Sequence, residues 1–206
     1  MRRGGCTRGL VYGGMGRSLR RENVEPRLRG RFGRPYEFVE LCSSTQRLLA
    51  ESAEEGAVAA TDEQTAGRGR LGRRWEAPAG TSLLFSLLLR PPTETARWPE
   101  LSVVAGRAVA EAIVDVTGLV ATVKHPNDVL VGGRKVAGVL AEATEGRVVL
   151  GVGVNVSQST AELPADARMP PTSLELETGS PVDRGELLVE ILHRLEVRYA
   201  AWIETP

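Results

Sequence analysis

Two apolar stretches constrain the fold of this chain more than any other feature. Residues 82–89 read SLLFSLLL and residues 148–156 read VVLGVGVNV. Their length and the turn-forming residues around them predict two buried strands. Neither stretch approaches the ~20 apolar residues that cross a bilayer, and 42% of the 206 residues are hydrophobic. The chain is therefore expected to pack these strands inside one ordinary globular domain.

Helices and further strands are predicted around these two stretches. Apolar residues at helical spacing, with capping residues, predict three helices: from a cap at Ser43 or Ser44 through Ala53 to Gly56, over 101–116 with Gly118 as terminator, and from Asp183 through Tyr199. Short strands are predicted at 58–61, 120–124, 129–131 and 135–141, with a tight Gly132-Gly133 hairpin between the last two. This order favours an α+β fold with a mixed sheet over a doubly wound parallel sheet.

Residues 1–35 stand apart from this pattern. They hold ten Arg and two Glu without apolar periodicity, so they carry +8 in a chain whose net charge is zero. We expect a disordered Arg/Gly-rich extension ahead of a domain that spans 36–206. A solvated tail, or residues ahead of a true start at Met15, is the favoured interpretation. Contact with nucleic acid or another acidic surface is the alternative.

Cysteine and histidine are scarce, which excludes several kinds of site. Cys6 and Cys42 cannot form a disulfide framework, and His125 and His193 lie too far apart in the chain for a zinc cluster. No secretory signal and no nucleophile motif of a hydrolase is recognisable. We therefore expect a cytoplasmic location and a chemistry that depends on positioning and charge neutralisation rather than on a covalent enzyme intermediate.

Residues 64–81 hold many Gly and Arg and are predicted to form a loop. Within it, residues 67–72 match the dinucleotide pattern G-x-G-x-x-G, but residues 73–78 do not resemble the start of a helix, so that interpretation is rejected. A cationic loop fits better, because glycine lets backbone N–H groups approach phosphate and arginine offers planar forks to phosphate or carboxylate. Trp75 can stack on a base or an apolar ligand. An RNA-binding Arg-Gly segment and a merely solvated loop are the alternatives.

Lys124 and Lys135 are the two lysines among 26 basic residues. In so arginine-rich a chain, a retained lysine suggests a position that needs a compact ammonium, although chance gives the same pattern. Asp128 lies in a segment typical of turns and can also help to hold a metal–phosphate complex. Gly138 leaves room on the sheet for a close ligand. Asn155 is interpreted as a polar group at a strand end that needs a partner.

Four segments taken together resemble biotin protein ligases, the biotin–[acetyl-CoA-carboxylase] ligases. They are Ser43-Ser44-Thr45-Gln46, residues 64–75 (QTAGRGRLGRRW), residues 124–130 (KHPNDVL) with 135–140 (KVAGVL), and residues 151–156 (GVGVNV). Their order and spacing agree with the family over roughly residues 36–203. One segment alone would be weak, whereas four in sequence are specific. The resemblance is to the monofunctional type, which lacks an N-terminal DNA-binding domain.

The resemblance implies a fold and an activity. The fold would be the catalytic domain of biotin and lipoate protein ligases, which is like that of class II synthetases and has a mixed β-sheet flanked by helices. The family joins biotin to ATP, giving biotinyl-5′-AMP and pyrophosphate, and then transfers biotin to a lysine of a carrier domain. ATP and Mg²⁺ would be needed, and biotin would be the substrate. The partner would be the biotin carboxyl carrier protein domain of acetyl-CoA or a related carboxylase.

The resemblance also implies roles for individual residues. Lys135 and Arg70 would be catalytic, and Asp128 would lie near Mg²⁺. The residues that would bind biotin are Ser44, Thr45, Gln46, Gln64, Arg68, Gly69, Arg70, Lys135 and Gly138. The residues that would bind ATP are Arg70, Arg73, Trp75, Asn127, Lys135 and Asn155.

The sequence departs from the family pattern at two positions. His125, where Trp is usual, is interpreted as a wall of the biotin pocket, and Gln46 stands where Asn is usual. The small C-terminal β domain common in the family is expected to be absent, because the chain stops soon after the last predicted helix. A lipoate–protein ligase and a non-catalytic biotin- or nucleic-acid-binding homologue are the alternatives. We expect no membrane association, and a homodimer is left open.

Overall fold

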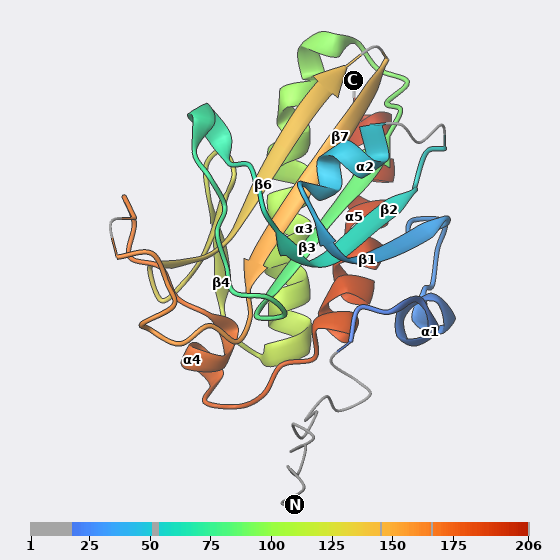
Figure 1. The fold of residues 1–206 in the computed structure, drawn as a ribbon. Helices are drawn as coiled ribbons and strands as arrows, with labels where there is room; N and C mark the ends of the chain where they lie inside the picture. The colour runs from blue at the N-terminus through green and yellow to red at the C-terminus, as the bar shows by residue number, and fades with distance from the viewer. Residues whose placement is uncertain (1–17, 51–53, 145, 166, 206) are drawn as a thin grey trace, which may run out of the picture.

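The computed structural model describes residues 18–50, 54–144, 146–165 and 167–205. Its centre is one seven-stranded sheet with the strand order β1-β2-β3-β7-β6-β5-β4 (Figure 1). The strands are β1 (Tyr36–Cys42), β2 (Val58–Gln64), β3 (Ser82–Leu89), β4 (Ala121–Lys124), β5 (Asp128–Val131), β6 (Arg134–Thr144) and β7 (Arg147–Asn155). β1 and β2 run parallel, and the other neighbouring pairs run antiparallel. The sheet is therefore mixed, and the predicted α+β class is confirmed.

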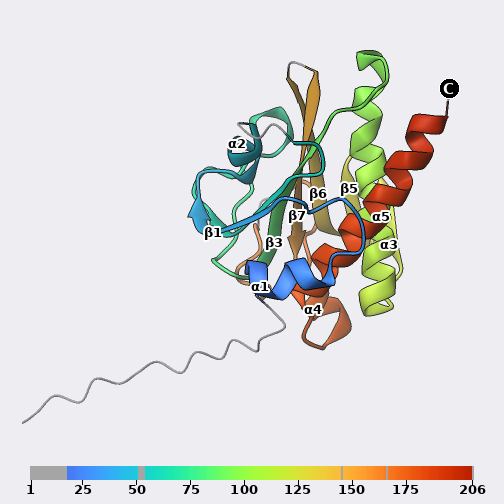
Figure 2. The same ribbon diagram turned by 90° about the vertical axis from the view of Figure 1, so that its right-hand side faces the viewer.

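Two long helices cover one face of the sheet, and a short helix lies on the other. α3 (Leu101–Thr117) and α5 (Arg184–Glu204) pack against each other behind the sheet, whereas α2 (Thr45–Ala50) lies on the opposite face (Figures 1 and 2). The remaining helical segments are α1 (Arg21–Val24), η1 (Glu25–Arg27), η2 (Arg70–Gly72), η3 (Thr95–Glu100) and α4 (Leu174–Thr178). The face that carries α2 is only partly covered, which leaves room there for a ligand site.

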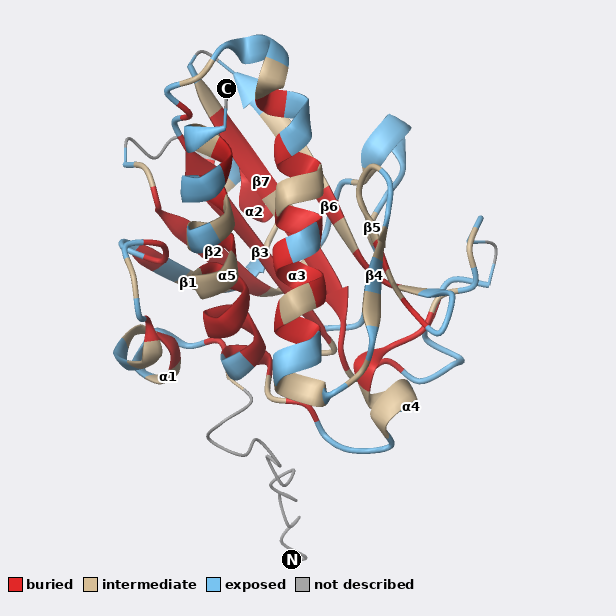
Figure 3. Cartoon of the chain, turned by 180° about the vertical axis from the view of Figure 1, so that it is seen from behind, coloured by how far each residue is buried: buried red, intermediate tan, exposed pale blue. Residues whose placement is uncertain are grey.

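The main core lies between the sheet and the two long helices, whose inner faces are buried (Figure 3). β3 is buried along its whole length, because α3 and α5 cover one of its faces and α2 covers part of the other. Leu48 and Leu49 of α2 pack against Ala59, Leu88 and Val149 in a second, smaller cluster. This two-sided burial explains why residues 82–89 are apolar without alternation.

The two apolar stretches form the central pair of strands. Residues 82–89 are β3 with the predicted bounds, and β7 begins and ends one residue before the predicted 148–156. The pair runs in register from Ser82 opposite Asn155 to Leu89 opposite Val148. The predicted glycine hairpin is also confirmed, because Gly132 and Gly133, with φ of 55° and 76°, join β5 to β6.

The predicted helix ends are set by the expected residues. Asp183 caps α5, where its Oδ1 accepts hydrogen bonds from the backbone N–H groups of Gly185 (2.8 Å) and Glu186 (3.0 Å). Gly118 ends α3 in the left-handed conformation. α2 follows Ser44 as predicted, but the expected continuation of this helix through 51–53 lies outside the described residues.

The expectation of a disordered extension over residues 1–35 is wrong for residues 18–35, while residues 1–17 lie outside the described part. Leu19, Val24 and Phe32 are almost completely buried in the main core. Three arginines of this segment, Arg27, Arg29 and Arg31, pair with acidic side chains of α5, and Arg29 Nη1 lies 2.9 Å from Glu190 Oε2. Disorder was expected because the apolar residues have no period, but their partners come from the other end of the chain.

Among the elements that were not predicted are β1 and α4. Polar and apolar residues do not alternate regularly along β1, which is an edge strand of the sheet and pairs in parallel with β2. α4 has five residues, which is too short for a helical period to be visible. In the described part of the chain, no helix is both long and apolar enough to cross a membrane.

Candidate active site

Four neighbouring strands place Lys124, Asp128, Gly138 and Gly153 in one transverse row across the sheet. Lys124 of β4 lies opposite Asp128 of β5, Asp128 lies opposite Gly138 of β6, and Gly138 lies opposite Gly153 of β7. Residues directly opposite each other present their side chains on the same face of a sheet. The row therefore runs from an ammonium at the β4 edge, through a carboxylate, to two positions without side chains near the centre.

A cavity of about 640 Å³ opens over this row on the α2 face. The loop between β2 and β3 lies over it, and the segment between β7 and α4 closes its outer side. The lining residues named for their polar or charged groups are Ser44, Thr45, Gln46, Gln64, Arg68, Arg70, Arg73, Arg74, Trp75, Lys124, His125, Asn127, Asp128, Lys135 and Arg168. Seven of these are Lys or Arg, and Asp128 is the one acidic residue among the described residues that line the cavity. The site is therefore suited to an anionic ligand.

The absence of side chains at two glycines lets Trp75 lie directly on the sheet. A Cβ at Gly153 would come within 2.7 Å of Trp75 Cε2, and a Cβ at Gly138 would come within 3.2 Å of Trp75 Cζ3. The missing side chain at Gly151 likewise makes room for Gln46, whose Cδ would be 2.9 Å from a Cβ there. The indole and the amide thus form adjacent parts of the cavity wall. Gly138 leaves room on the sheet as expected, but Trp75 and the Lys135 side chain lie in that space, and a close ligand there stays a prediction.

Lys135 reaches the same face because β6 contains a bulge. Val129 and Leu130 are consecutive on β5 but lie opposite Ala137 and Lys135, so β6 has one extra residue at this point. In a regular strand Lys135 and Gly138 would face opposite sides of the sheet, and the extra residue brings them to the same side. The Lys135 ammonium consequently lies above Gly138, 3.4 Å from where a Cβ would be.

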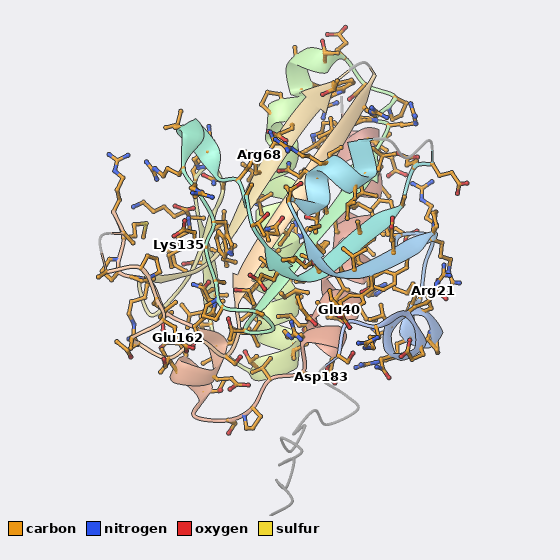
Figure 4. All side chains as sticks on the ribbon, in the orientation of Figure 1. Arg21, Glu40, Arg68, Lys135, Glu162 and Asp183 are labelled. Carbon is orange, nitrogen blue, oxygen red and sulfur yellow. The ribbon has the colours of Figure 1, made fainter. Side chains whose placement is uncertain are left out.

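Two neighbours fix the Lys135 ammonium in the cavity. Its Nζ lies 2.6 Å from Asp128 Oδ1 and 5.9 Å from the centre of the Trp75 ring. The backbone of Lys135 is also held, because its N–H donates to Pro170 O and its carbonyl accepts from Thr172 N–H, both at 2.9 Å. Lys135 and Arg68, both labelled in Figure 4, line the same cavity. The lysine is therefore a positioned cation rather than a solvated edge charge.

The arginine-rich loop is tied down at both sides of the cavity. Arg68 forms an ion pair with Glu142 of β6, and Arg70 Nη1 donates to Asn127 Oδ1 at 3.3 Å. The base of the loop is closed by Trp75 N–H, which donates to Gly67 O at 3.1 Å. No helix follows the glycines within residues 73–81, so the rejection of a dinucleotide-binding turn is confirmed.

Polar side chains at the start of α2 form the inner wall. The Thr45 backbone N–H donates to Gln64 Oε1 at 2.9 Å, and the Thr45 hydroxyl lies 2.7 Å from the Ser86 hydroxyl. Gln46 Nε2 donates to the backbone carbonyls of Leu140 and Val149 at 3.3 and 3.4 Å. Ser44 is buried beside them. These groups offer a set of neutral donors and acceptors, in contrast to the cationic outer part of the cavity.

The structure brings together the predicted site residues except Asn155. That amide is buried, donates from Nδ2 to Thr172 O at 3.0 Å and accepts from Gln158 Nε2 at 3.2 Å. Asn155 therefore has the partner that a strand-end amide needs, but it does not line the cavity. His125 does line it, as expected of a wall residue.

Sequence reasoning missed the contribution of the segment between β7 and α4. Arg168 and Met169 line the cavity, and Met169 Sδ accepts a hydrogen bond from Lys124 Nζ at 3.1 Å. This segment has no period and no recognised motif. An arginine close to the prolines at 170 and 171 was the one signal available, and such a signal is weak.

Comparison with known proteins identifies what the chain resembles. The model of the Biotin/lipoate A/B protein ligase family matches residues 38–159. The Bifunctional ligase/repressor BirA of Bacillus subtilis is 36% identical over 171 residues, which cover 79% of this chain and 53% of that protein. The Biotin–[acetyl-CoA-carboxylase] ligase of Mycobacterium tuberculosis is 38% identical over 172 residues, covering 78% and 62%. The chain thus spans between half and two thirds of the length of these relatives.

Solved structures of biotin protein ligases are similar to this chain in fold. The biotin protein ligase from Aquifex aeolicus in complex with biotin and ATP superposes with a TM-score of 0.74 at 34% identity. The match covers 82% of this chain and 73% of that one. The apo structure from the same organism gives a TM-score of 0.67 at 31% identity. These values extend the agreement from the sequence motifs to the fold of most of the chain.

Proposed function

This chain belongs to the biotin/lipoate A/B protein ligase family, and from that premise we propose that it activates biotin with ATP and transfers it to a lysine of a biotin carboxyl carrier domain. The observation that carries the proposal is the position of Lys135. Its ammonium lies above Gly138, between Trp75 and Asp128, in a cavity that the arginine loop covers. The relatives named as biotin ligases favour biotin as the substrate.

In this proposal biotin occupies the inner, neutral part of the cavity. Its ring carries polar groups that need both donors and acceptors, and Ser44, Thr45 and Gln64 supply these side by side. Gln46 covers Gly151 and closes the bottom. Arg68, Gly69 and Gly138 line the path from there toward Lys135. A bound ring would thus direct its acid group toward the ammonium.

The nucleotide would occupy the outer, cationic part. Arg70, Arg73 and Asn127 line this region. The buried indole N–H of Trp75 has no hydrogen-bond partner among the described residues, and an acceptor on a bound ligand would satisfy it. Asn155 would act from behind the wall, because its amide contacts Thr172 and Gln158.

The chemical problem is the approach of two anions. The biotin carboxylate must attack the α-phosphorus of ATP, and their charges repel each other. A fixed ammonium at Lys135, with the Arg70 guanidinium near Asn127, lowers this barrier as negative charge builds on the phosphoryl oxygens. Because these groups are held before the reaction, little reorganisation is needed.

Magnesium is part of the proposal, since ATP is commonly used as its Mg²⁺ complex. No group of three metal-binding side chains occurs in the described part of the chain. That is compatible with Mg²⁺, which usually takes one or two carboxylates and completes its shell with phosphates and water. Asp128 is the residue that would hold it. The ion would supply charge neutralisation at the phosphates.

Transfer to the carrier needs an amine to reach the activated carbonyl. A second cavity of about 740 Å³ adjoins the first and shares Arg70, His125 and Leu140 with it, so an acceptor lysine could come from this side. The loop of residues 67–75 would shield the adenylate from water until then. The cytoplasmic location stays part of the proposal, in keeping with ATP as substrate and with Cys42 as a free thiol.

The test is ATP-dependent labelling of a carrier domain with biotin, with Lys135→Ala as the inactive comparison. We expect labelling by the wild type and its loss in the variant. A parallel assay with lipoate decides the alternative within the same family. Biotin binding without release of pyrophosphate by a correctly folded wild type would instead indicate a non-catalytic homologue.

A further inference from the structure

We propose that Lys124 binds the β- and γ-phosphates of ATP and then the departing pyrophosphate, at the outer end of the cavity. The inference rests on the proposed adenylation reaction and adds to it the residue that receives the leaving group. It makes Lys124 a catalytic residue that is distinct from Lys135. Both lysines of the chain line the same cavity, although the other 24 basic residues are arginine.

The position of Lys124 follows from the transverse row. Lys124 and Gly138 both lie opposite Asp128, one on each side. Strands are spaced by about 4.8 Å, so the Lys124 backbone lies roughly 10 Å outward from Gly138. The Lys135 ammonium lies above Gly138. The two ammonium groups thus mark the inner and outer ends of a path along the row, and a triphosphate is an extended anion of comparable length.

The ammonium of Lys124 is available for a ligand. Asp128, its cross-strand neighbour, is engaged by Lys135. The hydrogen bond of Lys124 in the described part of the chain goes to the thioether of Met169, which is a weak acceptor. An ammonium has three donors, so most of its capacity remains. Arg168, the residue before Met169, also lines the cavity, so the segment that contacts Lys124 supplies a further cation.

The chemistry needs a cation at this place. When a carboxylate oxygen of biotin bonds to the α-phosphorus, the bond from that phosphorus to the bridging oxygen breaks. The electron pair of that bond goes to the departing pyrophosphate, whose charge rises. Lys135 lies beside Trp75 and Asp128 at the inner end, so it is placed for the α-phosphate. Lys124 is placed to stabilise the charge on the leaving group.

The experiment uses the full chain and runs the first half-reaction in both directions. Pyrophosphorolysis of purified biotinyl-5′-AMP gives the KM for inorganic pyrophosphate, and a single-turnover assay gives the rate of adenylate formation. For Lys124→Gln we expect the KM for pyrophosphate to rise, and the forward rate to fall, by between about tenfold and about a hundredfold, the loss of one hydrogen bond to a charged group. Lys124→Arg should recover only part of both, because a planar guanidinium replaces the compact ammonium. The KM for biotin should change less than twofold.

The controls separate this inference from the proposed function. Arg21→Gln removes an exposed cation of α1 that pairs with Glu25 of η1, away from the cavity, and should behave as the wild type in both assays. If the wild type forms no adenylate, the proposed function fails and the Lys124 role fails with it. If the wild type and Arg21→Gln are active and Lys124→Gln keeps the wild-type KM for pyrophosphate, the role of Lys124 alone is overturned. An equal loss in the KM for biotin would also overturn it, because a general structural defect would explain that result.

Discussion

The Lys135 ammonium lies 2.6 Å from Asp128 Oδ1, so the acidic residue that lines the cavity holds this ammonium in place. Both side chains are about three-quarters buried, with exposed fractions of 27% and 23%. The pair fixes a long, flexible side chain above Gly138, where the proposed reaction needs a charge. Asp128 is thus a positioning residue for Lys135, in addition to its proposed role toward Mg²⁺.

Replacement of Asp128 should slow adenylate formation through Lys135. We expect Lys135→Ala to lower the single-turnover rate by ~10²–10³, as for other preorganised charge-stabilising groups. Asp128→Asn should lower it by less, and the double variant should be no slower than Lys135→Ala alone, because Asp128 acts through that lysine. The measurement is a double-mutant cycle at saturating Mg²⁺. Independent, multiplying losses would show that Asp128 does not work through Lys135.

Gly153→Ala should displace Trp75 from the sheet. The new Cβ would come within 2.7 Å of the indole, and the ring cannot stay in place at that separation. Binding of ATP should weaken, and the tryptophan emission should shift. Gly106→Ala in α3 is the matched control, since its Cβ would meet Val123 Cγ1 of β4 at an ordinary 3.4 Å. Unchanged emission and nucleotide affinity in Gly153→Ala would contradict the packing described for Trp75.

Residues 18–35 should contribute to the stability of the domain. Phe32 is almost completely buried and its ring lies 5.8 Å from that of Tyr199 on α5. Phe32→Ala should therefore lower the free energy of unfolding by about 3–5 kcal/mol. Arg21→Gln, on the exposed side of the same segment, should change it by less than about 0.5 kcal/mol. Denaturant unfolding of both variants checks this, and equal stabilities would mean that the segment does not pack in solution.

The ion pair between α3 and α5 should make stability depend on pH. Hydrogen bonding from Arg198 lowers the pKa of Glu111, and Nε donates to Oε2 at 2.7 Å. Because the pKa of Glu111 is lower in the folded than in the unfolded protein, the ion pair contributes its full stability at pH values above the unfolded pKa, which is near 4.3 for Glu. This contribution disappears as the pH falls through the folded-state pKa. Arg198→Gln should thus cost stability at pH 7, by less than about 1 kcal/mol because both side chains are about one-third exposed. The difference from the wild type should vanish near pH 2, and a difference that persists there would refute the assignment.

The predictable parts of the fold are those that local sequence determines. Ser82–Leu89 and the Gly132-Gly133 hairpin were predicted because apolar length and left-handed glycines act over a few residues. The packing of Phe32 was not predictable, because its ring packs against Tyr199, which lies 167 residues away on α5. Local composition therefore indicated disorder where long-range contacts give order.

The site was predictable as a set of residues but not as a geometry. The motifs identified most of the residues that line the cavity but neither Arg168 nor Met169, and the family resemblance implied roles for the residues that they identified. A regular strand would have placed Lys135 on the face away from Gly138, and the bulge at Val136 reverses that orientation. A bulge depends on the pairing of β5 with β6, so the sequence of β6 alone does not reveal it. The contact between Lys124 and Met169 was hidden because it joins β4 to a segment 45 residues further along the chain.

The most direct test of the central claim is the formation of biotinyl-5′-AMP from biotin and Mg-ATP by the purified chain. The wild type should form the adenylate and release pyrophosphate in equal amounts, and Lys135→Ala should do so ~10²–10³ times more slowly while it keeps the wild-type fold. Adenylate formation by Lys135→Ala at the wild-type rate would contradict the role given to this ammonium.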